Sequence, residues 1–506
     1  MPNHDADRQE WETGYRTTEL RANALGLPAI VMQGVTHIAP AVGMVLTIQF
    51  ITSLAGVTSP LSYFFAFLIV LLLGASLTQL AKHLPSAGGY YTYVSRTVHP
   101  RAGFLTAWLY FLYDPTCPAI NLAFMGFFFE STLKAEWGIT WFKWWLFFLI
   151  GTAFVTWIIY RGIKISVWTV VVLGVFEIAI VVVLAIFGLF SPGPGGVNLS
   201  SYNPGNALTT NGLFLGVVFA IFAFTGFEAV APLAEESERP RRTLPRGIMY
   251  SILIMGAFYL FCSWGILLGW GTDRLPSFIS SAENPVFVLA KHLWGGAWIL
   301  VFLAVINSIF AVCIACSNAA TRVFYRMAET GSLPKPLAKV HPRFGTPVNA
   351  ILLMCFLTLA IGLGLGFWIG PDQEFFMMGI AITLSLAAVY SLGNLGVVRY
   401  YWRERRSEFN IWLHLVFPVV STAALGYVCY KSLSPLPALP VGAAPWIALA
   451  MLVSGVIVVF AISWTGREEW LYKAGAVYEG DVPQPAAAVG EPPGGPPSAG
   501  PTDEVG

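Results

Sequence analysis

The sequence contains little charge: only 11% of its 506 residues are Asp, Glu, Lys or Arg, whereas soluble globular proteins carry about 25%. In contrast, 56% of the residues are hydrophobic. This composition excludes an ordinary soluble enzyme. It predicts instead a chain of membrane-crossing segments, each of which needs roughly 20 apolar residues to span about 30 Å of hydrocarbon.

The chain also lacks the motifs of several function classes. It contains neither a G-x-x-x-x-G-K-[ST] phosphate-binding loop nor an H-E-x-x-H zinc helix, so neither ATP hydrolysis nor zinc proteolysis is supported. The formal net charge of +1 offers no basic face to a nucleic acid. We therefore expect no enzymatic activity, no cofactor, no metal and no nucleic-acid partner.

Disulfide bonds are not expected either, because all six cysteines fall within apolar runs. Cys313 and Cys316 form a C-x-x-C pair. On a membrane-spanning helix this spacing is interpreted as small packing residues rather than as a metal or redox pair. The first 24 residues lack the apolar core of a signal peptide.

Apolar runs between clusters of charge predict twelve membrane spans. They cover residues 28–50, 61–81, 103–129, 141–160, 166–190, 211–232, 247–270, 297–321, 348–370, 375–398, 411–430 and 445–464. With this count, 23 of the 28 Lys and Arg residues lie on the side of the N-terminus. Because basic residues concentrate in cytoplasmic loops, the asymmetry favours twelve crossings with both termini in the cytoplasm.

The spans divide the chain into three parts. We expect a cytoplasmic N-terminal segment over residues 1–24 and a transmembrane domain over residues 25–465. Residues 466–506 are rich in Pro, Gly and Ala, so we expect a disordered cytoplasmic tail. The stretch 84–101 contains Gly88-Gly89 and three tyrosines, and it is polar enough to form a surface helix in a cytoplasmic loop.

Three charged residues lie away from the ends of the predicted spans, and all are acids: Asp114, Glu177 and Glu228. Counting 1.5 Å per residue places Asp114, Glu177 and His37 roughly 14–17 Å deep, near the midplane. Ionisable groups at this depth are expensive and usually functional. Two structural alternatives stay open, namely a neutral Glu177 bonded to a neighbouring helix and a local role for Asp114 before Pro115.

Two predicted spans are punctured by glycine and proline at similar depths. The first contains Gly34, Pro40 and Gly43, and the sixth contains Gly226 and Pro232. Interrupted helices in oppositely oriented halves point to the binding site of a secondary transporter. Their free N–H groups suit a carboxylate and their free carbonyls suit an ammonium group, although helix packing alone also explains glycine and proline in membranes.

At these residues the sequence resembles the amino acid–polyamine–organocation (APC) permeases, in their bacterial amino acid permease type. The resemblance covers about residues 20–402. Its motifs are Pro85-Ser-Ala-Gly-Gly-Tyr-Tyr-Thr-Tyr93, Gly103-Phe-Leu-Thr-Ala-Trp108, Phe222 to Glu228 with Leu233-Ala-Glu-Glu236, Arg239-Pro-Arg-Arg242 and Leu244-Pro-Arg246, and Thr321-Arg322 followed by Ala328-Glu-Thr-Gly331, Leu333-Pro334 and Gly345-Thr-Pro347.

The resemblance implies an all-α integral membrane protein of twelve helices. Helices 1–5 and 6–10 would form an LeuT/APC-like 5+5 inverted repeat with helices 1 and 6 broken at the midplane, and helices 11 and 12 would be peripheral. It further implies a multi-pass permease of the cell membrane that imports amino acids by alternating access around a site between helices 1, 3, 6, 8 and 10.

Candidate site residues follow from the breaks, the buried acids and the resemblance. The expected substrate-binding residues are Thr36, His37, Ile38, Ala39, Pro40, Ala41, Asp114, Phe222, Phe224, Thr225, Gly226 and Phe227. The resemblance implies that Phe222 is an aromatic lid and that Tyr91 and Glu228 form the inner gate. Asn307 and Ser308 are secondary candidates, which by default bond neighbouring helices.

The sequence departs from the family pattern at two places. The first break reads His37-Ile-Ala-Pro-Ala41, where many members have a Gly-Ser-Gly type break. Glu177 stands where proton-coupled relatives can have a lysine. Burial favours the neutral form of a carboxylic acid, as a reversible proton carrier requires, so we expect proton symport with Glu177 as coupling group and Glu228 assisting.

Two alternatives stay open. Asp114 and Glu177 could pair with a cationic amine or polyamine instead of a proton, and a transport-inactive amino acid sensor is the alternative from another class. The expected partners are an amino acid or amine, a proton and the lipid bilayer. A cytoplasmic group of charges is interpreted either as an ion-pair cluster or as a solvated loop: Glu235, Glu236, Glu238, Arg239, Arg241 and Arg242.

Overall fold

The computed structural model describes residues 24–433 and 439–464, and within them the secondary structure is helical, without a strand. Except for Ala24, the predicted N-terminal segment and the predicted tail lie outside the described residues. The α-helices are α2 Leu27–His37, α3 Pro40–Val45, α4 Ile48–Ala55, α5 Ser59–His83, α6 Tyr90–Thr97, α7 Pro100–Tyr110, α8 Cys117–Trp137, α9 Trp144–Tyr160, α10 Ile163–Phe190, α11 Thr210–Ala223, α12 Pro240–Trp270, α13 Leu275–Ile279, α14 Pro285–Trp294, α15 Ile299–Thr330, α16 Val348–Ile369, α17 Pro371–Arg403, α18 Phe417–Leu433 and α19 Ala444–Trp464.

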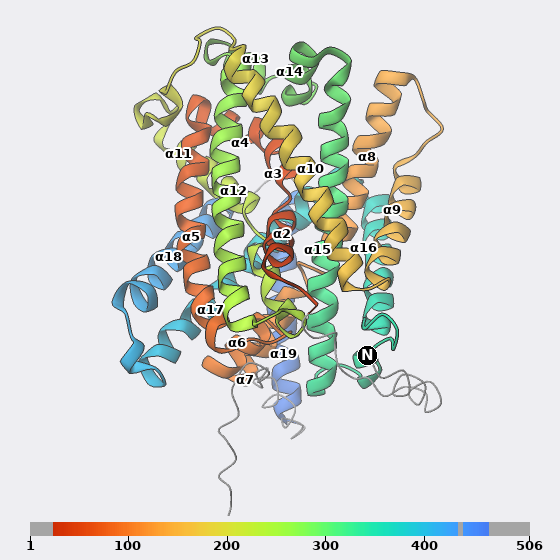
Figure 1. Ribbon diagram of the computed structural model, residues 1–506, viewed down its shortest axis with the longest axis vertical. Coiled ribbons are helices and arrows are strands. Elements are labelled where there is room, and N and C mark those ends of the chain that lie inside the picture. Colours follow the sequence, from red (N-terminus) through yellow and green to blue (C-terminus); the bar gives the residue numbers. More distant parts are fainter. Residues whose placement is uncertain (1–23, 434–438, 465–506) are drawn as a thin grey trace, which may run out of the picture.

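Short 3-10 helices and one π-helix connect or extend these elements. The 3-10 helices are η1 Gly56–Thr58, η2 Ser200–Tyr202, η3 Pro204–Asn206, η4 Phe227–Glu236, η5 Thr272–Arg274, η6 Gly295–Trp298, η7 Lys335–Ala338, η8 Arg406–Glu408 and η10 Val441–Ala443, and the π-helix is η9 Trp412–Val416. The α-helices form a bundle in which α2 and α15 lie centrally (Figure 1). The short helices α13 and α14 lie at one end of the bundle, and α6 and α7 lie at the other (Figure 1).

Nine helical stretches of the described residues are long and apolar enough to cross a membrane. Two further apolar helices, Trp144–Tyr160 and Trp412–Tyr427, are shorter. The structure therefore supports an all-helical, multi-pass membrane protein. The count of twelve crossings stays a prediction.

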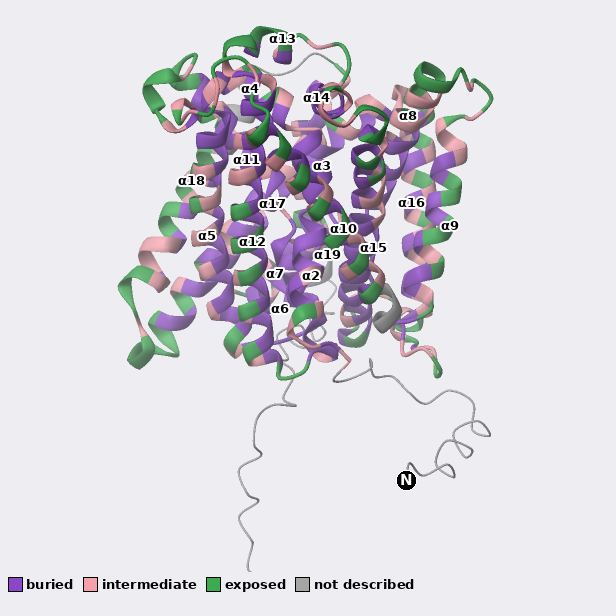
Figure 2. Cartoon of the chain, turned by 45° about the horizontal axis from the view of Figure 1, so that its top comes forward, coloured by how far each residue is buried: buried purple, intermediate pink, exposed green. Residues whose placement is uncertain are grey.

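The outer faces of the bundle suit lipid rather than water. Large apolar side chains point outward on α9, α10, α16 and α19, for example Ile150, Trp168, Trp368 and Phe460. Figure 2 shows buried residues concentrated in the central helices and exposed ones on outward faces. Contiguous apolar surface of this kind is rare on soluble monomers, and a bilayer covers it without cost.

The third predicted span, residues 103–129, is divided into two helices. It consists of α7 and α8, joined by a turn that contains Asp114 and Pro115. Proline lacks a backbone N–H and disfavours the helical conformation of the residue before it, which explains the break. The helix break expected at Pro115 is therefore confirmed.

The prediction that residues 84–101 form a surface helix is wrong, because α6 is buried along most of its length. It packs against α7 at Gly103, where a Cβ atom would overlap Ser95. It packs against α17 at Gly393, where a Cβ atom would overlap the Tyr90 ring. The tyrosines that made the segment look polar thus fill space between helices.

A buried ion pair joins η4 to α15 at the end of the bundle that contains α6. Arg322 Nε donates to Glu236 Oε2 at 2.8 Å and Arg322 Nη2 donates to Glu236 Oε1 at 3.2 Å, and neither side chain is exposed. The backbone carbonyl of Glu236 also accepts hydrogen bonds from the amides of Ala24 and Leu25. The partner of Glu236 is therefore Arg322 of a distant helix, and not one of the neighbouring arginines at 239, 241 and 242.

We expect Glu236→Gln to lower the thermal stability of the purified protein, because Arg322 would keep a buried charge without a counter-charge. Removing one partner of a buried pair costs about 3–5 kcal/mol, whereas exposed pairs are worth about 0–1 kcal/mol. The matched control is Glu404→Gln, which breaks the exposed pair between Glu404 and Arg96. Equal melting temperatures for the two variants would contradict a structural role for the buried pair.

Candidate functional site

The two interrupted helices contact each other at their breaks. The first break follows His37: Ala39 has a left-handed backbone with φ 57°, and α3 begins at Pro40. The second lies between α11 and η4, where Gly226 has φ 115°. A Cβ atom on Gly226 would lie 2.9 Å from the His37 carbonyl oxygen, so only glycine allows this approach.

The amides at the start of α3 already have partners within the protein. Ala41 N donates to Glu177 Oε2 at 3.1 Å, and Val42 N donates to Ser308 Oγ at 3.3 Å. Pro40 has no N–H, and Gly43 N donates to the Ala39 carbonyl. The donors that a helix start usually offers to an anion are therefore occupied by side chains from α10 and α15 and by the chain itself.

The second break shows the same arrangement. Gly226 N donates to Glu228 Oε2 at 3.1 Å, and both residues are buried. Tyr259 of α12 is a donor instead of an acceptor: its hydroxyl donates to the carbonyls of Ala223 at 2.9 Å and Ile38 at 3.5 Å. Tyr259 thus bonds to both breaks. Nothing in the sequence around Tyr259 indicates this role.

His37 and Asp114 lie side by side beneath the first break. His37 Nε2 is 3.1 Å from Asp114 Oδ1 and 3.2 Å from the sulfur of Cys316, and all three residues are buried. Glu177 contacts the same break at Ala41. The three residues predicted near the midplane, His37, Asp114 and Glu177, therefore all lie around the first break, although they do not form one cluster. The break between α7 and α8 positions Asp114, and no periodicity argument could have predicted its partner.

Tyrosine rings lie around the acids. The Tyr113 ring centroid is 5.5 Å from that of His37 and 5.7 Å from that of Tyr110. Tyr390 of α17 lies 5.8 Å from Tyr90 and 5.7 Å from Phe227. Of these four tyrosines, only Tyr90 belongs to a motif that the sequence singles out.

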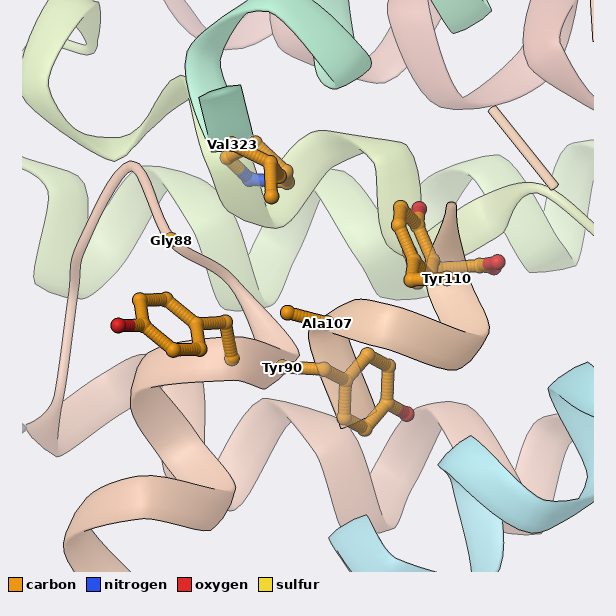
Figure 3. Close-up of a pocket in the computed structure, with 8 residues that line it drawn as sticks. Gly88, Tyr90, Ala107, Tyr110 and Val323 are labelled. Carbon is orange, nitrogen blue, oxygen red and sulfur yellow. The ribbon is translucent and has the colours of Figure 1, made fainter. Parts of the chain in front are cut away.

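A small cavity adjoins Glu228. Its lining residues are Gly88, Tyr90, Tyr91, Ala107, Tyr110, Glu228, Pro232 and Val323. Figure 3 shows Tyr90, Ala107, Tyr110 and Val323 arranged around it. The two expected inner-gate residues, Tyr91 and Glu228, therefore share one cavity, although the Tyr91 hydroxyl bonds to Thr330 at 3.1 Å and Ser332 at 2.7 Å.

Three other polar candidates bond to backbone carbonyls instead of pointing at a ligand. Thr36 donates to the carbonyl of Met32, and Thr225 donates to that of Phe222. Asn307 Nδ2 donates to the Leu173 carbonyl at 2.6 Å, which joins α15 to α10. These contacts match the default role of polar groups between membrane helices.

The aromatic candidates of the second break point in different directions. Phe224 packs edge to face on Tyr259 with the centroids 4.8 Å apart, so its side chain belongs to the α12 contact. Phe222 is half-buried, and its ring lies 3.5 Å from the Cβ position of Gly379 on α17. A lid role for Phe222 stays a prediction.

Comparison with known proteins adds to this geometry. The model of a family described as amino acid permease matches residues 29–474. The chain is 28% identical over 423 residues to the low-affinity putrescine importer PlaP of Escherichia coli (strain K12), which covers 81% of this chain and 88% of the relative. It is 25% identical to the branched-chain amino acid permease BcaP of Bacillus subtilis (strain 168), and that match covers 61% of this chain and 68% of the relative. It is 24% identical to the serine/threonine exchanger SteT of the same organism, and that match covers 71% of this chain and 79% of the relative.

We expect Gly226→Ala to abolish the activity of the protein, because the new methyl group would overlap His37 and the left-handed backbone disfavours alanine by about 1–2 kcal/mol. The matched control is Gly295→Ala, which changes a glycine of φ 55° with nothing within 4 Å of its Cβ position. The measurement is uptake of a radiolabelled substrate into cells that express the two variants at equal levels. Normal uptake by Gly226→Ala would show that the contact between the breaks is dispensable.

Proposed function

The chain belongs to the amino acid permease family, and from this premise we propose that it is a secondary active transporter of the cell membrane that imports a small molecule bearing a protonated amino group. The proposal includes twelve crossings, a 5+5 inverted repeat, cytoplasmic termini and alternating access around the two breaks. The transmembrane domain would extend over residues 25–465.

Among the two substrate classes, the geometry favours cationic amines. The observation that carries this choice is that the amides of Ala41 and Gly226, one in each break, are bonded to the carboxylates of Glu177 and Glu228. A substrate carboxylate would have to displace them from these amides. An ammonium group meets no such competition.

The surroundings of the breaks support the same substrate class. Residues 27–45, 102–133 and 210–238 contain no Lys or Arg that could bind a carboxylate. Asp114 Oδ1 lies 3.1 Å from His37 Nε2, and tyrosine side chains lie close by. Carboxylates together with aromatic faces are the groups that bind organic ammonium ions. Among the relatives, PlaP is described as a putrescine importer.

Amino acids remain the second candidate, because the family description and relatives such as BcaP and SteT support them. This alternative requires Glu177 or Glu228 to leave its backbone partner so that the freed amide can bind the substrate carboxylate. Protonation of the acid would weaken its hydrogen bond to the amide and allow that movement.

Proton symport would act through Glu177. Its carboxylate ties α3 to α10, while Ser308 of α15 ties the next amide of α3 to the bundle. A charged carboxylate accepts a stronger hydrogen bond from Ala41 than a neutral one does. Gain or loss of a proton would therefore change how firmly α3 is held, which couples the proton to movement of the broken helix.

To test the substrate class, we expect putrescine to raise the melting temperature of the purified protein and to compete for uptake, whereas ornithine should do neither. The two molecules differ by one carboxylate, so the comparison isolates that group. A ligand that binds only the native state must stabilise it. Stronger competition by ornithine or by neutral amino acids would favour the amino acid class, and binding without any uptake would favour a sensor.

To test proton coupling, we expect Glu177→Gln to lose accumulation driven by a pH gradient in proteoliposomes while it retains exchange of labelled for unlabelled substrate. Glutamine keeps the size and the acceptor oxygen but cannot exchange a proton. Glu283→Gln, which changes an exposed acid of the ion pair with Lys291, is the matched control. Full gradient-driven accumulation by Glu177→Gln would refute the coupling role.

A further inference from the structure

Four side chains of types that bind metals converge between three segments of the bundle. They are His37 at the end of α2, Asp114 in the turn before α8, Cys117 at the first position of α8, and Cys316 of α15. Each is at most 4% exposed. Nε2 of His37, a carboxylate oxygen of Asp114 and the sulfur of Cys316 all lie within 4.8 Å of one another. Cys117 lies beside this group and is not part of it: its sulfur is 2.6 Å from that of Cys316 and accepts a hydrogen bond from it.

Ordinary packing and hydrogen bonding leave this cluster poorly explained. The contact between His37 and Asp114 at 3.1 Å lacks hydrogen-bond geometry, and among the described residues only the Tyr110 hydroxyl is placed to bond the buried Asp114 carboxylate. His37 Nδ1 is buried without a partner among them. Lone pairs that face one another in a dry interior are costly unless a cation or protons lie between them.

The donor set and the spacing fit a zinc ion. Zinc takes thiolate, imidazole and carboxylate ligands at about 2.0–2.3 Å in a tetrahedron, which places ligand atoms about 3.4–3.8 Å apart. The separations of 3.1 Å between His37 and Asp114 and 3.2 Å between His37 and Cys316 are slightly shorter. Small outward shifts of these three side chains would therefore admit the ion and leave the fourth position of the tetrahedron open.

We propose that His37, Asp114 and Cys316 form a site for a thiophilic divalent cation, Zn²⁺, and that the bound ion blocks transport. The Asp114 carboxylate and the Cys316 thiolate, which forms by release of a proton, balance its two positive charges. The ion joins α2, the turn before α8 and α15, and it binds next to the first break. Cys316 is thus assigned a ligand role, whereas the sequence predicts that both cysteines of the C-x-x-C pair are packing residues.

Binding is tested on the purified, reduced full-length protein with Co²⁺ as a spectroscopic probe and Zn²⁺ as competitor. We expect one Co²⁺ per chain, an absorption band from thiolate-to-cobalt charge transfer, and loss of that band when Zn²⁺ is added. Cys316→Ser and Asp114→Asn should each weaken binding by about tenfold or more, since even groups that only support a ligand contribute that much. Cys355→Ser, which changes a thiol of α16 outside the cluster, should bind as the unaltered protein does.

The absence of a thiolate band in the unaltered protein, or an equal band in Cys316→Ser and Asp114→Asn, would overturn the proposal. Two ligand variants are used so that poor folding of one does not decide the result. Inhibition is measured separately, as the ratio of uptake with and without Zn²⁺ in each variant. This arm rests on the proposed transport function, whereas the cobalt spectrum does not, so the two proposals can fail independently. Inhibition that persists unchanged in Cys316→Ser would overturn the blocking role.

Discussion

A backbone N–H or C=O group inside a bilayer has no water to bond, so it must find a partner within the protein. The breaks at Ala39 and Gly226 lie in the interior, and the groups that bond to their backbone organise the central structure. Glu177 and Ser308 bind amides of the first break, Glu228 binds an amide of the second, and Tyr259 bonds to carbonyls of both. Elements distant in the sequence are thereby fixed around one point.

The same bonds decide what the site can recognise. Amides that are bonded to internal carboxylates are not available to an anion. The groups left to bind a substrate are the acidic side chains and the tyrosine rings beside them. A protonated amine suits those groups. Because a hydrogen bond to a carboxylate weakens on protonation, the contact between Glu177 and Ala41 also links proton binding to the position of α3.

The sequence predicts part of this arrangement. Glycine and proline mark both breaks, and the rarity of charge in the spans singles out Asp114, Glu177 and Glu228. Pro115 likewise marks the break before α8. The buried position of α6 was overlooked because its tyrosines were interpreted as polar.

Other features depend on tertiary contacts that helical periodicity does not contain. Cys117 and Cys316 are 199 residues apart, and each alone looks like a packing residue. Likewise, Glu236 is followed closely by three arginines, yet it pairs with Arg322 of α15 because burial rather than proximity in the chain selects the partner.

The most direct test of this account is an experimental structure of the protein with bound putrescine. The account predicts an ammonium group within hydrogen-bonding distance of Asp114 or Glu228, among the tyrosine rings, while the Ala41 amide remains bonded to Glu177. A complex with an amino acid whose carboxylate lies on the amides of Ala41 and Gly226, with Glu177 and Glu228 displaced, would contradict it.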